Sequence, residues 1–187
     1  MALTLEIFIH MDAVNRNEWT GPGEARPLTD LGKKQAERLA EEIAAGGPVN
    51  ALYSSTAVRC TESMEPFAKR FGLPVQIAPG FKDTSGYKAP AGWERGDGKG
   101  PDPLGGASSA GSAYRSLSNM REALPDGSRA VLCSYGDIVP ALLAFLSGAN
   151  GIEMPPRLDK KGALYTVVFD GDKATISHRD ASEGFPA

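Results

Sequence analysis

The sequence predicts an α/β fold, a three-layer α/β/α sandwich built around a mostly parallel sheet. Three observations predict it. Short apolar runs rich in β-branched residues alternate along the chain with segments in which apolar residues repeat at helical spacing. Two runs near the end are joined by Asp170-Gly171-Asp172, which is typical of a hairpin. The length of 187 residues suits one domain with a full-sized core, so we expect a single domain over residues 1–187.

The predicted elements follow in order from these patterns. Runs of apolar and β-branched residues predict strands at Leu3–Ile9, Ala51–Tyr53, Val75–Ile77, Ala130–Cys133, Ala163–Phe169 and Lys173–His178. Apolar residues at helical spacing predict helices over 31–43, 57–71 and 112–124, and a fourth that begins after Asp137. Thr29-Asp30 and Asp137 offer N-cap oxygens, and Gly72 ends the second helix. Residues 80–111, with nine glycines, are predicted to be loop.

Composition and charge exclude several classes of partner and cofactor. The net charge of −3 comes from 20 basic and 23 acidic residues that are mixed along the chain, so we expect neither nucleic acid nor a membrane surface as a partner. With two histidines and two cysteines, Cys60 and Cys133, outside any metal-like spacing, we expect no metal and no cofactor. The same cysteine usage indicates a reduced, cytoplasmic protein. The partner that remains is a small molecule, and the oligomeric state is unknown.

Topology predicts where a ligand would bind. In parallel α/β sheets, ligands bind beyond the carboxyl ends of the strands. Three polar segments follow predicted strands there: His10 after the first strand, Ser54-Ser55 after the second and Ser134-Tyr135 after the fourth.

Three sequence segments around these positions carry a resemblance. They are Ile7–Ala13 followed by Arg26-Pro27-Leu28-Thr29, then Tyr53-Ser54-Ser55 with Val58-Arg59-Cys60-Thr61, and finally Val131–Asp137. In this order they resemble the three motifs of the histidine phosphatase superfamily, whose fold is phosphoglycerate mutase-like. The short form is most similar to the small phosphatases that occur alone or fused to Nudix hydrolases.

The resemblance implies a mechanism and assigns residues to it. In this family a histidine attacks phosphorus and becomes phosphohistidine, arginines and a second histidine hold the phosphoryl oxygens, and a carboxylic acid protonates the leaving oxygen. The resemblance places His10 as nucleophile, Arg59 as the second-motif arginine and Asp83 as the acid. Arg16 and Ser134 are further candidates for ligand binding.

Three positions depart from the family pattern. Ile9 stands where the family has its first arginine, Met11 where it has a small residue, and Tyr135 where it has the second histidine. Two missing charge-assisted contacts correspond to about 3–6 kcal/mol, or on the order of 10² to 10⁴ in rate. We therefore expect weak phosphatase activity and a ligand pocket that Ile9, Met11 and Tyr135 line and make more apolar, unless Arg16, Arg26 or Lys82 enters it. The alternatives are a divergent enzyme acting on a small, possibly phosphorylated metabolite and an inactive pseudophosphatase that binds a ligand or partner.

Overall fold

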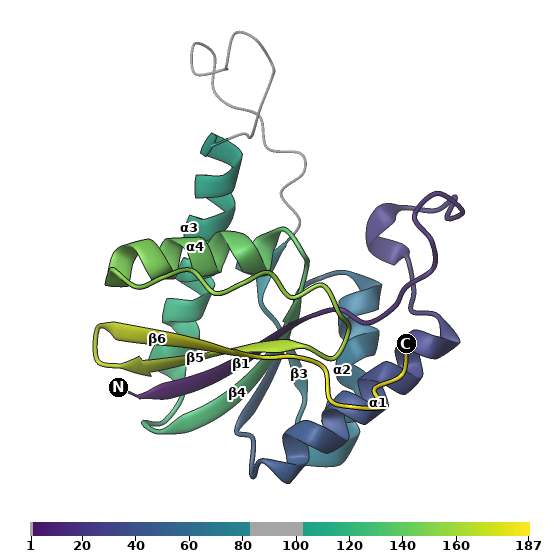
Figure 1. Ribbon diagram of the computed structural model, residues 1–187, viewed down its shortest axis with the longest axis horizontal. Coiled ribbons are helices and arrows are strands. Elements are labelled where there is room, and N and C mark those ends of the chain that lie inside the picture. Colours follow the sequence, from purple (N-terminus) through teal and green to yellow (C-terminus); the bar gives the residue numbers. More distant parts are fainter. Residues whose placement is uncertain (1, 83–102) are drawn as a thin grey trace, which may run out of the picture.

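A computed structural model describes residues 2–82 and 103–187 (Figure 1). Its strands are β1 Leu3–Ile9, β2 Ala51–Ser54, β3 Val75–Ile77, β4 Ser128–Ser134, β5 Leu164–Asp170 and β6 Lys173–Arg179. Its helices are α1 Asp30–Ala45, α2 Val58–Phe71, α3 Pro103–Ala123 and α4 Ile138–Asn150, with the short 3-10 turns η1 Gly23–Ala25 and η2 Pro79–Phe81. The predicted α/β class is confirmed.

The strands form one mixed sheet in the order β3-β2-β4-β1-β5-β6. β1, β2, β3 and β4 are parallel, because β4 pairs in parallel with both β1 and β2, and β2 pairs in parallel with β3. The hairpin of β5 and β6 adds to the far side of β1, with β5 antiparallel to β1. This hairpin is the antiparallel part of an otherwise parallel sheet, as its turn sequence predicted.

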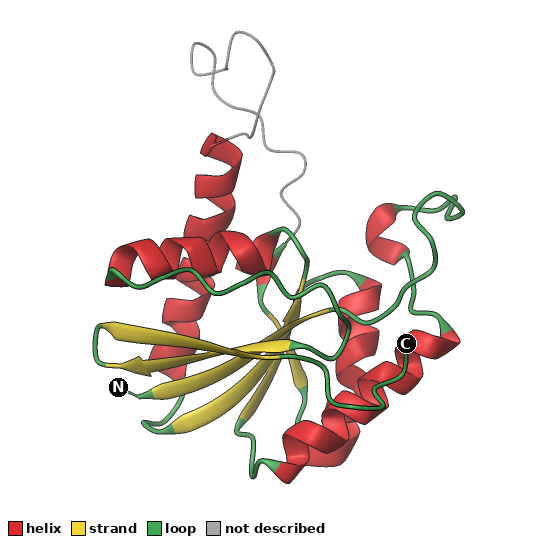
Figure 2. Cartoon of the chain, in the orientation of Figure 1, coloured by secondary structure: helices red, strands yellow, loops and turns green. Residues whose placement is uncertain are grey.

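Helices cover both faces of the sheet, which gives the three predicted layers (Figure 2). α1 and α2 pack together on one face, and α3 and α4 pack together on the other. The face under α2 is closed by the stacked rings of Phe8 and Phe67, whose centroids lie 5.4 Å apart. On the other face, Tyr114 of α3 contacts Phe145 of α4. Both faces of β1 are therefore buried, which explains its nearly continuous apolar sequence.

The helix ends follow the predicted signals. The Thr29 side chain accepts a hydrogen bond from the Gly32 N–H and so caps α1. Gly72 ends α2 with φ +65°, a left-handed conformation that glycine adopts without steric cost. Asp137 caps α4 through the Ile138 N–H. Because each cap fixes where its helix begins or ends, it also fixes the loop that connects the helix to the neighbouring strand.

The predicted loop over residues 80–111 is wrong at both ends. It begins inside η2, and α3 starts at Pro103, nine positions before the predicted residue Ser112. A glycine costs about 1 kcal/mol in a helix, and the glycines near the start of α3 obscured the pattern. Burial of Leu117 and Met120 along the same helix offsets that cost.

The described residues hold neither a membrane-spanning helix nor a cluster of metal ligands. No helix in residues 2–82 and 103–187 is long and apolar enough to cross a membrane. Within those same ranges, no three His, Cys, Asp or Glu side chains gather closely enough to hold a metal ion.

Candidate active site

The carboxyl ends of β1, β2 and β4 meet at one edge of the sheet. The last residue of β1, Ile9, pairs with Ser134 of β4, and the last residue of β2, Ser54, pairs with Cys133. Beyond the strands the backbones stay joined, since His10 N donates to the Ser134 carbonyl at 3.0 Å. The three segments that resemble the family motifs therefore lie side by side, and the side chain of His10 lies among them.

The His10 imidazole is held in one tautomer. Its Nδ1 lies 2.8 Å from the Met11 carbonyl oxygen, which can only accept a hydrogen bond, so Nδ1 carries the proton. The lone pair is then on Nε2. Burial, the positive charge of Lys161 and the smaller effects of Arg59 and Arg26 together lower the pKa of His10 to about 3. His10 is consequently neutral at neutral pH, with an unprotonated nitrogen that can act as a nucleophile.

The start of α1 fixes the loop that carries His10. The Asp12 carbonyl accepts from Thr29 N at 3.1 Å, and the Asp12 N–H donates to the Gln35 side chain at 3.0 Å. The Thr29 hydroxyl donates to the Asp12 carboxylate at 2.5 Å. Gly32 makes this contact possible, because an added Cβ there would lie 1.9 Å from the Asp12 carbonyl oxygen. The loop is thus rigidly attached to a helix rather than left free, which favours precise placement of the imidazole.

Arg59 and Tyr135 form a stacked pair beside His10. Arg59 comes from the first turn of α2 and is 8% exposed, and its guanidinium lies 4.8 Å from the centre of the Tyr135 ring. Its Nη1 donates to the Gly23 carbonyl at 2.9 Å. Among the described residues, Arg59 Nε, Tyr135 Oη and Ser55 Oγ are buried without a hydrogen-bond partner. Buried polar atoms of this kind are usually satisfied, so three near one strand edge indicate room for a polar ligand.

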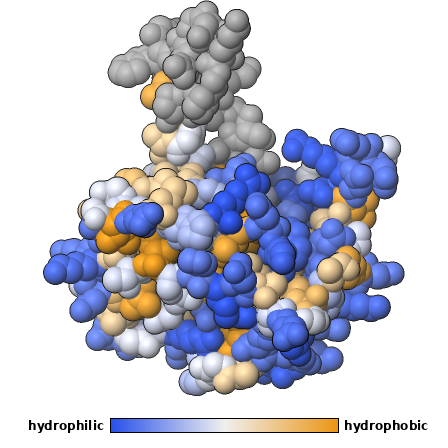
Figure 3. Space-filling view, viewed as in Figure 1, coloured by the Kyte–Doolittle hydropathy of each residue, from blue (hydrophilic) through white to orange (hydrophobic). Residues whose placement is uncertain are grey.

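Arg59 also lines a cavity of about 270 Å³ together with the loop that follows β1. The other lining residues are Arg16, Trp19, Gly21, Gly23 and Arg26. Arg26 is anchored through Nη1, which donates to the Val14 carbonyl at 2.6 Å. This loop projects from the body of the protein (Figure 1) and presents a hydrophilic surface, blue in Figure 3. The cavity is therefore walled by three guanidinium groups and one indole ring.

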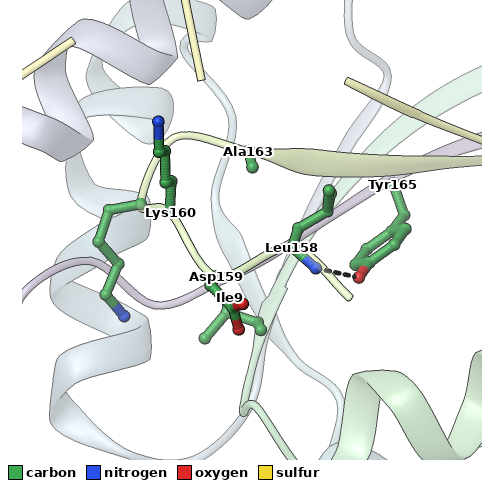
Figure 4. A pocket seen from close by; sticks show the side chains of 7 residues that line it. Ile9, Leu158, Asp159, Lys160, Ala163 and Tyr165 are labelled. Atoms are coloured by element: carbon green, nitrogen blue, oxygen red, sulfur yellow. Dashed lines mark hydrogen bonds between the residues drawn. The ribbon is translucent and has the colours of Figure 1, made fainter. Parts of the chain in front are cut away.

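Besides Arg59 and Arg26, a cation from a distant part of the sequence, Lys161, contacts His10. Lys161 lies in the segment before β5, and its Nζ donates to the His10 carbonyl at 2.6 Å. Burial lowers the pKa of Lys161. Its side chain also lines a small cavity beside Ile9, whose other walls are shown in Figure 4. The ammonium group thus lies at the His10 backbone, and its side chain shares a cavity with Ile9, the residue that stands where the family motif has an arginine.

The positive charges around His10 are only partly offset by a carboxylate, since Asp12 is close enough to raise the pKa of Arg26 and of Lys161 but forms no ion pair with either. In the parts of the chain that the structure describes, no ion pair involves Arg16, Arg26, Arg59 or Lys161. Instead, backbone carbonyls anchor three of the four, which fixes their positions without cancelling their charge. Arg59 and Arg16 lower the pKa of Arg26 in addition to the effect of burial, so these groups are close enough to repel one another. An anion between them would relieve that repulsion.

The other predicted site residues occupy different places. Met11 is fully buried and belongs to the hydrophobic core. Ser134 is also fully buried, and its hydroxyl lies 3.4 Å from the Phe81 carbonyl. Ile9 lines the small cavity beside Lys161 rather than the arginine-lined one. Asp83, the predicted acid, lies outside the described residues.

Sequence reasoning missed part of the site. It expected a more apolar pocket, whereas the cavity next to Arg59 is lined by charged and polar groups. Arg26 was considered only as a residue that could enter the pocket, and Lys161 was not considered at all. Arg26 had a signal, because it opens the Arg-Pro-Leu-Thr segment that resembles the family. Lys161 had none, since nothing in Lys160-Lys161-Gly162 connects that segment with His10, which is far away in sequence.

Comparison with known proteins agrees with this architecture. Over 76 residues the chain is 35% identical to an 8-oxo-(d)GTP phosphatase of Mycolicibacterium smegmatis. The aligned stretch covers 41% of this chain and 23% of that protein. The chain spans less than a quarter of the length of the curated relatives it matches.

Solved structures share the fold at low sequence identity. A mycobacterial glucosyl-3-phosphoglycerate phosphatase in complex with VO3 superposes with a TM-score of 0.71 at 16% identity, over 96% of this chain and 99% of that one. The protein histidine phosphatase SixA, in complex with tungstate, gives a TM-score of 0.65 at 16% identity, over 95% of this chain and 96% of that one. At this level of identity the likeness shows the fold alone.

The sequence model of the histidine phosphatase superfamily (branch 1) matches residues 12–181. The match begins just after His10, and it includes Arg26, Arg59 and Lys161. It covers most of the chain, and the order of strands and the meeting of the three motif segments at one sheet edge agree with it. The chain therefore belongs to the histidine phosphatase superfamily.

Proposed function

We propose that the protein is a hydrolase that cleaves a small phosphorylated metabolite through a phosphohistidine at His10. The observation that carries the proposal is the state of His10 itself. A neutral imidazole with a free Nε2 lies among Arg59, Arg26 and Lys161, none of which forms an ion pair among the described residues. A nucleophile surrounded by fixed cations suits attack on an anionic phosphoryl group.

The reaction has two steps. The Nε2 lone pair of His10 attacks phosphorus, a P–N bond forms, and the P–O bond to the leaving group breaks with its electron pair moving to the leaving oxygen. That oxygen takes a proton, for which Asp83 remains the proposed donor. Water then attacks the phosphohistidine and gives a proton to the Asp83 carboxylate, which restores the acid, while the P–N bond breaks with its electrons returning to Nε2 and inorganic phosphate is released. Arg59 would hold the non-bridging oxygens in both steps.

We also propose that the protein hydrolyses simple phosphate monoesters slowly. Position 9 offers no guanidinium and position 135 no imidazole, and Tyr135 donates at most one uncharged hydrogen bond. Burial raises the pKa of Tyr135, so its hydroxyl stays protonated near neutral pH. The cavity beside Arg59 provides charges beyond the scissile group, so the preferred substrate would carry a second anionic group. The names of the relatives, an 8-oxo-(d)GTP phosphatase and a glucosyl-3-phosphoglycerate phosphatase, support a phosphorylated metabolite.

The test compares the unaltered protein with a His10→Gln variant, using p-nitrophenyl phosphate and a panel of singly and doubly anionic phosphorylated metabolites. We expect slow release of phosphate from the simple ester, faster release from doubly anionic compounds, and a loss of at least about 10³-fold in His10→Gln. Turnover that survives this substitution would exclude His10 as the nucleophile.

A second candidate is a pseudophosphatase that binds the same anion without turnover. The observation that favours it is the replacement of two charged motif residues by Ile9 and Tyr135. Calorimetric binding of inorganic phosphate without hydrolysis of any panel member would support it. Restoring the motif with Ile9→Arg and Tyr135→His is the complementary experiment. A large gain in phosphatase rate would show that the remaining apparatus is intact.

The proposal also keeps a cytoplasmic location, supported by Cys60 and Cys133, which are both free and buried.

A further inference from the structure

The segment before β5 holds Lys161 in a defined position. The Ala163 N–H donates to the Lys160 carbonyl at 3.3 Å and closes a turn in which Gly162 has φ +85°. A positive φ at this place is typical of a type II turn, where Lys161 takes the position before the glycine. The Phe185 ring packs on Gly162 so closely that an added Cβ would lie 2.5 Å from it. The turn is thus held by its own backbone hydrogen bond and by the Phe185 ring that packs on it.

A second set of contacts anchors the residues just before this turn. The Tyr165 hydroxyl of β5 accepts from the Leu158 N–H at 2.9 Å (Figure 4). It also donates to the Pro156 carbonyl at 3.0 Å. Leu158 is buried beneath. Because β5 pairs with β1 at Tyr165 and Ile7, these contacts place the segment next to the end of β1. The position of Lys161 relative to His10 is therefore set by the sheet itself.

The Lys161 ammonium is close to the reacting group and forms no direct ion pair, although the Asp12 carboxylate is near enough to raise its pKa. One of its three N–H bonds donates to the His10 carbonyl, and no ion pair in the described ranges involves it. Of the three cations that lower the pKa of His10, Lys161 has the largest effect. Its side chain passes beside Ile9, the motif position that has no charge.

We propose that Lys161 replaces the missing motif arginine, and that its ammonium binds a non-bridging oxygen of the phosphoryl group that His10 attacks. The inference rests on the proposed function, because it assigns one more contact to the same phosphoryl site. It explains how the site can lack an arginine at position 9 and still hold an anion next to His10. A charge that the first motif has lost is supplied by a turn more than 150 positions later in the sequence.

The test uses four forms of the protein: the unaltered chain, Lys161→Met, Lys161→Arg and, as a matched control, Lys160→Met. Lys160 is the exposed neighbour on the same turn. Calorimetry measures the affinity for inorganic phosphate, and p-nitrophenyl phosphate measures kcat/KM. We expect Lys161→Met to lose about 10- to 100-fold in both quantities, Lys161→Arg to recover most of the loss, and Lys160→Met to stay within about 2-fold of the unaltered protein.

A purely structural role for Lys161 predicts a different result. Lys161→Met would then lower the free energy of unfolding but leave phosphate affinity unchanged in the folded protein, and that outcome would overturn the inference. Lys161→Gln, whose amide can still donate a hydrogen bond, provides a second neutral variant if the methionine variant does not fold. Failure of the proposed function is distinguishable, because it would appear as an unaltered protein without turnover, whereas phosphate affinity would still report on Lys161.

Discussion

The strand ends and the loops contribute differently to the site. The ends of β1, β2 and β4 bring His10, Ser55 and Tyr135 together through backbone pairing, with His10 N bound to the Ser134 carbonyl. The loop after β1 and the turn before β5 instead bring charges, through Arg26 and Lys161. Positions 9 and 135 hold an isoleucine and a tyrosine, which carry no positive charge, whereas the loops carry Arg26 and Lys161. The absence of the family residues at positions 9 and 135 therefore does not leave the site without positive charge, because Arg26 and Lys161 lie in it.

The largest expected effect comes from the motif side. Arg59→Met should lower kcat/KM by about 10² to 10³, because it removes a buried guanidinium. Among the described residues, no other cation both stacks on Tyr135 and lines the arginine cavity.

Arg26→Met, on the loop side, should lower kcat/KM about 10-fold for substrates that carry a second anionic group. Arg115→Met, which changes an exposed residue of α3, is the control. If Arg26→Met lowered kcat/KM equally for simple and doubly anionic substrates, the separate roles of the motif segments and the loop would be contradicted.

The attachment of the His10 loop to α1 can be tested by adding one methyl group. Gly32→Ala places a Cβ against the Asp12 carbonyl and should lower the free energy of unfolding by about 1–3 kcal/mol. Gly148→Ala in α4 is the matched control, because a Cβ there meets no atom within 4 Å. It should leave stability unchanged or raise it by up to about 1 kcal/mol. Urea denaturation of both variants measures this, and a Gly32→Ala protein as stable as the unaltered chain would show that the contact yields easily.

The effect of pH on stability is the smallest near neutral pH and grows as the pH falls. The pKa of His10 is lowered to about 3 in the folded protein, so the unfolded chain binds a proton below about pH 6.5 that the folded chain does not. Stability should fall as the pH drops from about 6.5 towards 3, with a contribution from His10 of up to about 1.4 kcal/mol per pH unit. His10→Gln removes this contribution. Denaturation curves of the two proteins should therefore diverge as the pH falls, and parallel curves would show that His10 is not held neutral.

Much of the fold could be predicted because its signals are local. Thr29 and Asp137 cap helices, Gly72 ends one, and the apolar run of β1 is buried on both faces. The start of α3 could not be predicted, because glycines weaken the helical pattern and the burial of Leu117 that offsets their cost is a tertiary effect.

In the site, too, residues with a local sequence signal could be predicted and those placed by long-range pairing could not. His10 and Arg59 could be predicted because they follow strand ends within segments that resemble family motifs. Met11, by contrast, was expected to line the pocket and lies in the core. Lys161 could not be predicted, because only the pairing of β5 with β1 brings its turn to His10. Residues on loops depend on long-range pairing that no local pattern records.

The central claim is that fixed cations from motif and loop segments hold a phosphoryl group against a neutral His10. A crystal structure with bound orthovanadate, which resembles phosphorus during transfer, tests it most directly. The account predicts vanadium bonded to His10 Nε2, with its oxygens in hydrogen-bonding contact with Arg59 and Lys161. Vanadate that fails to bind, or that binds away from His10, would contradict it.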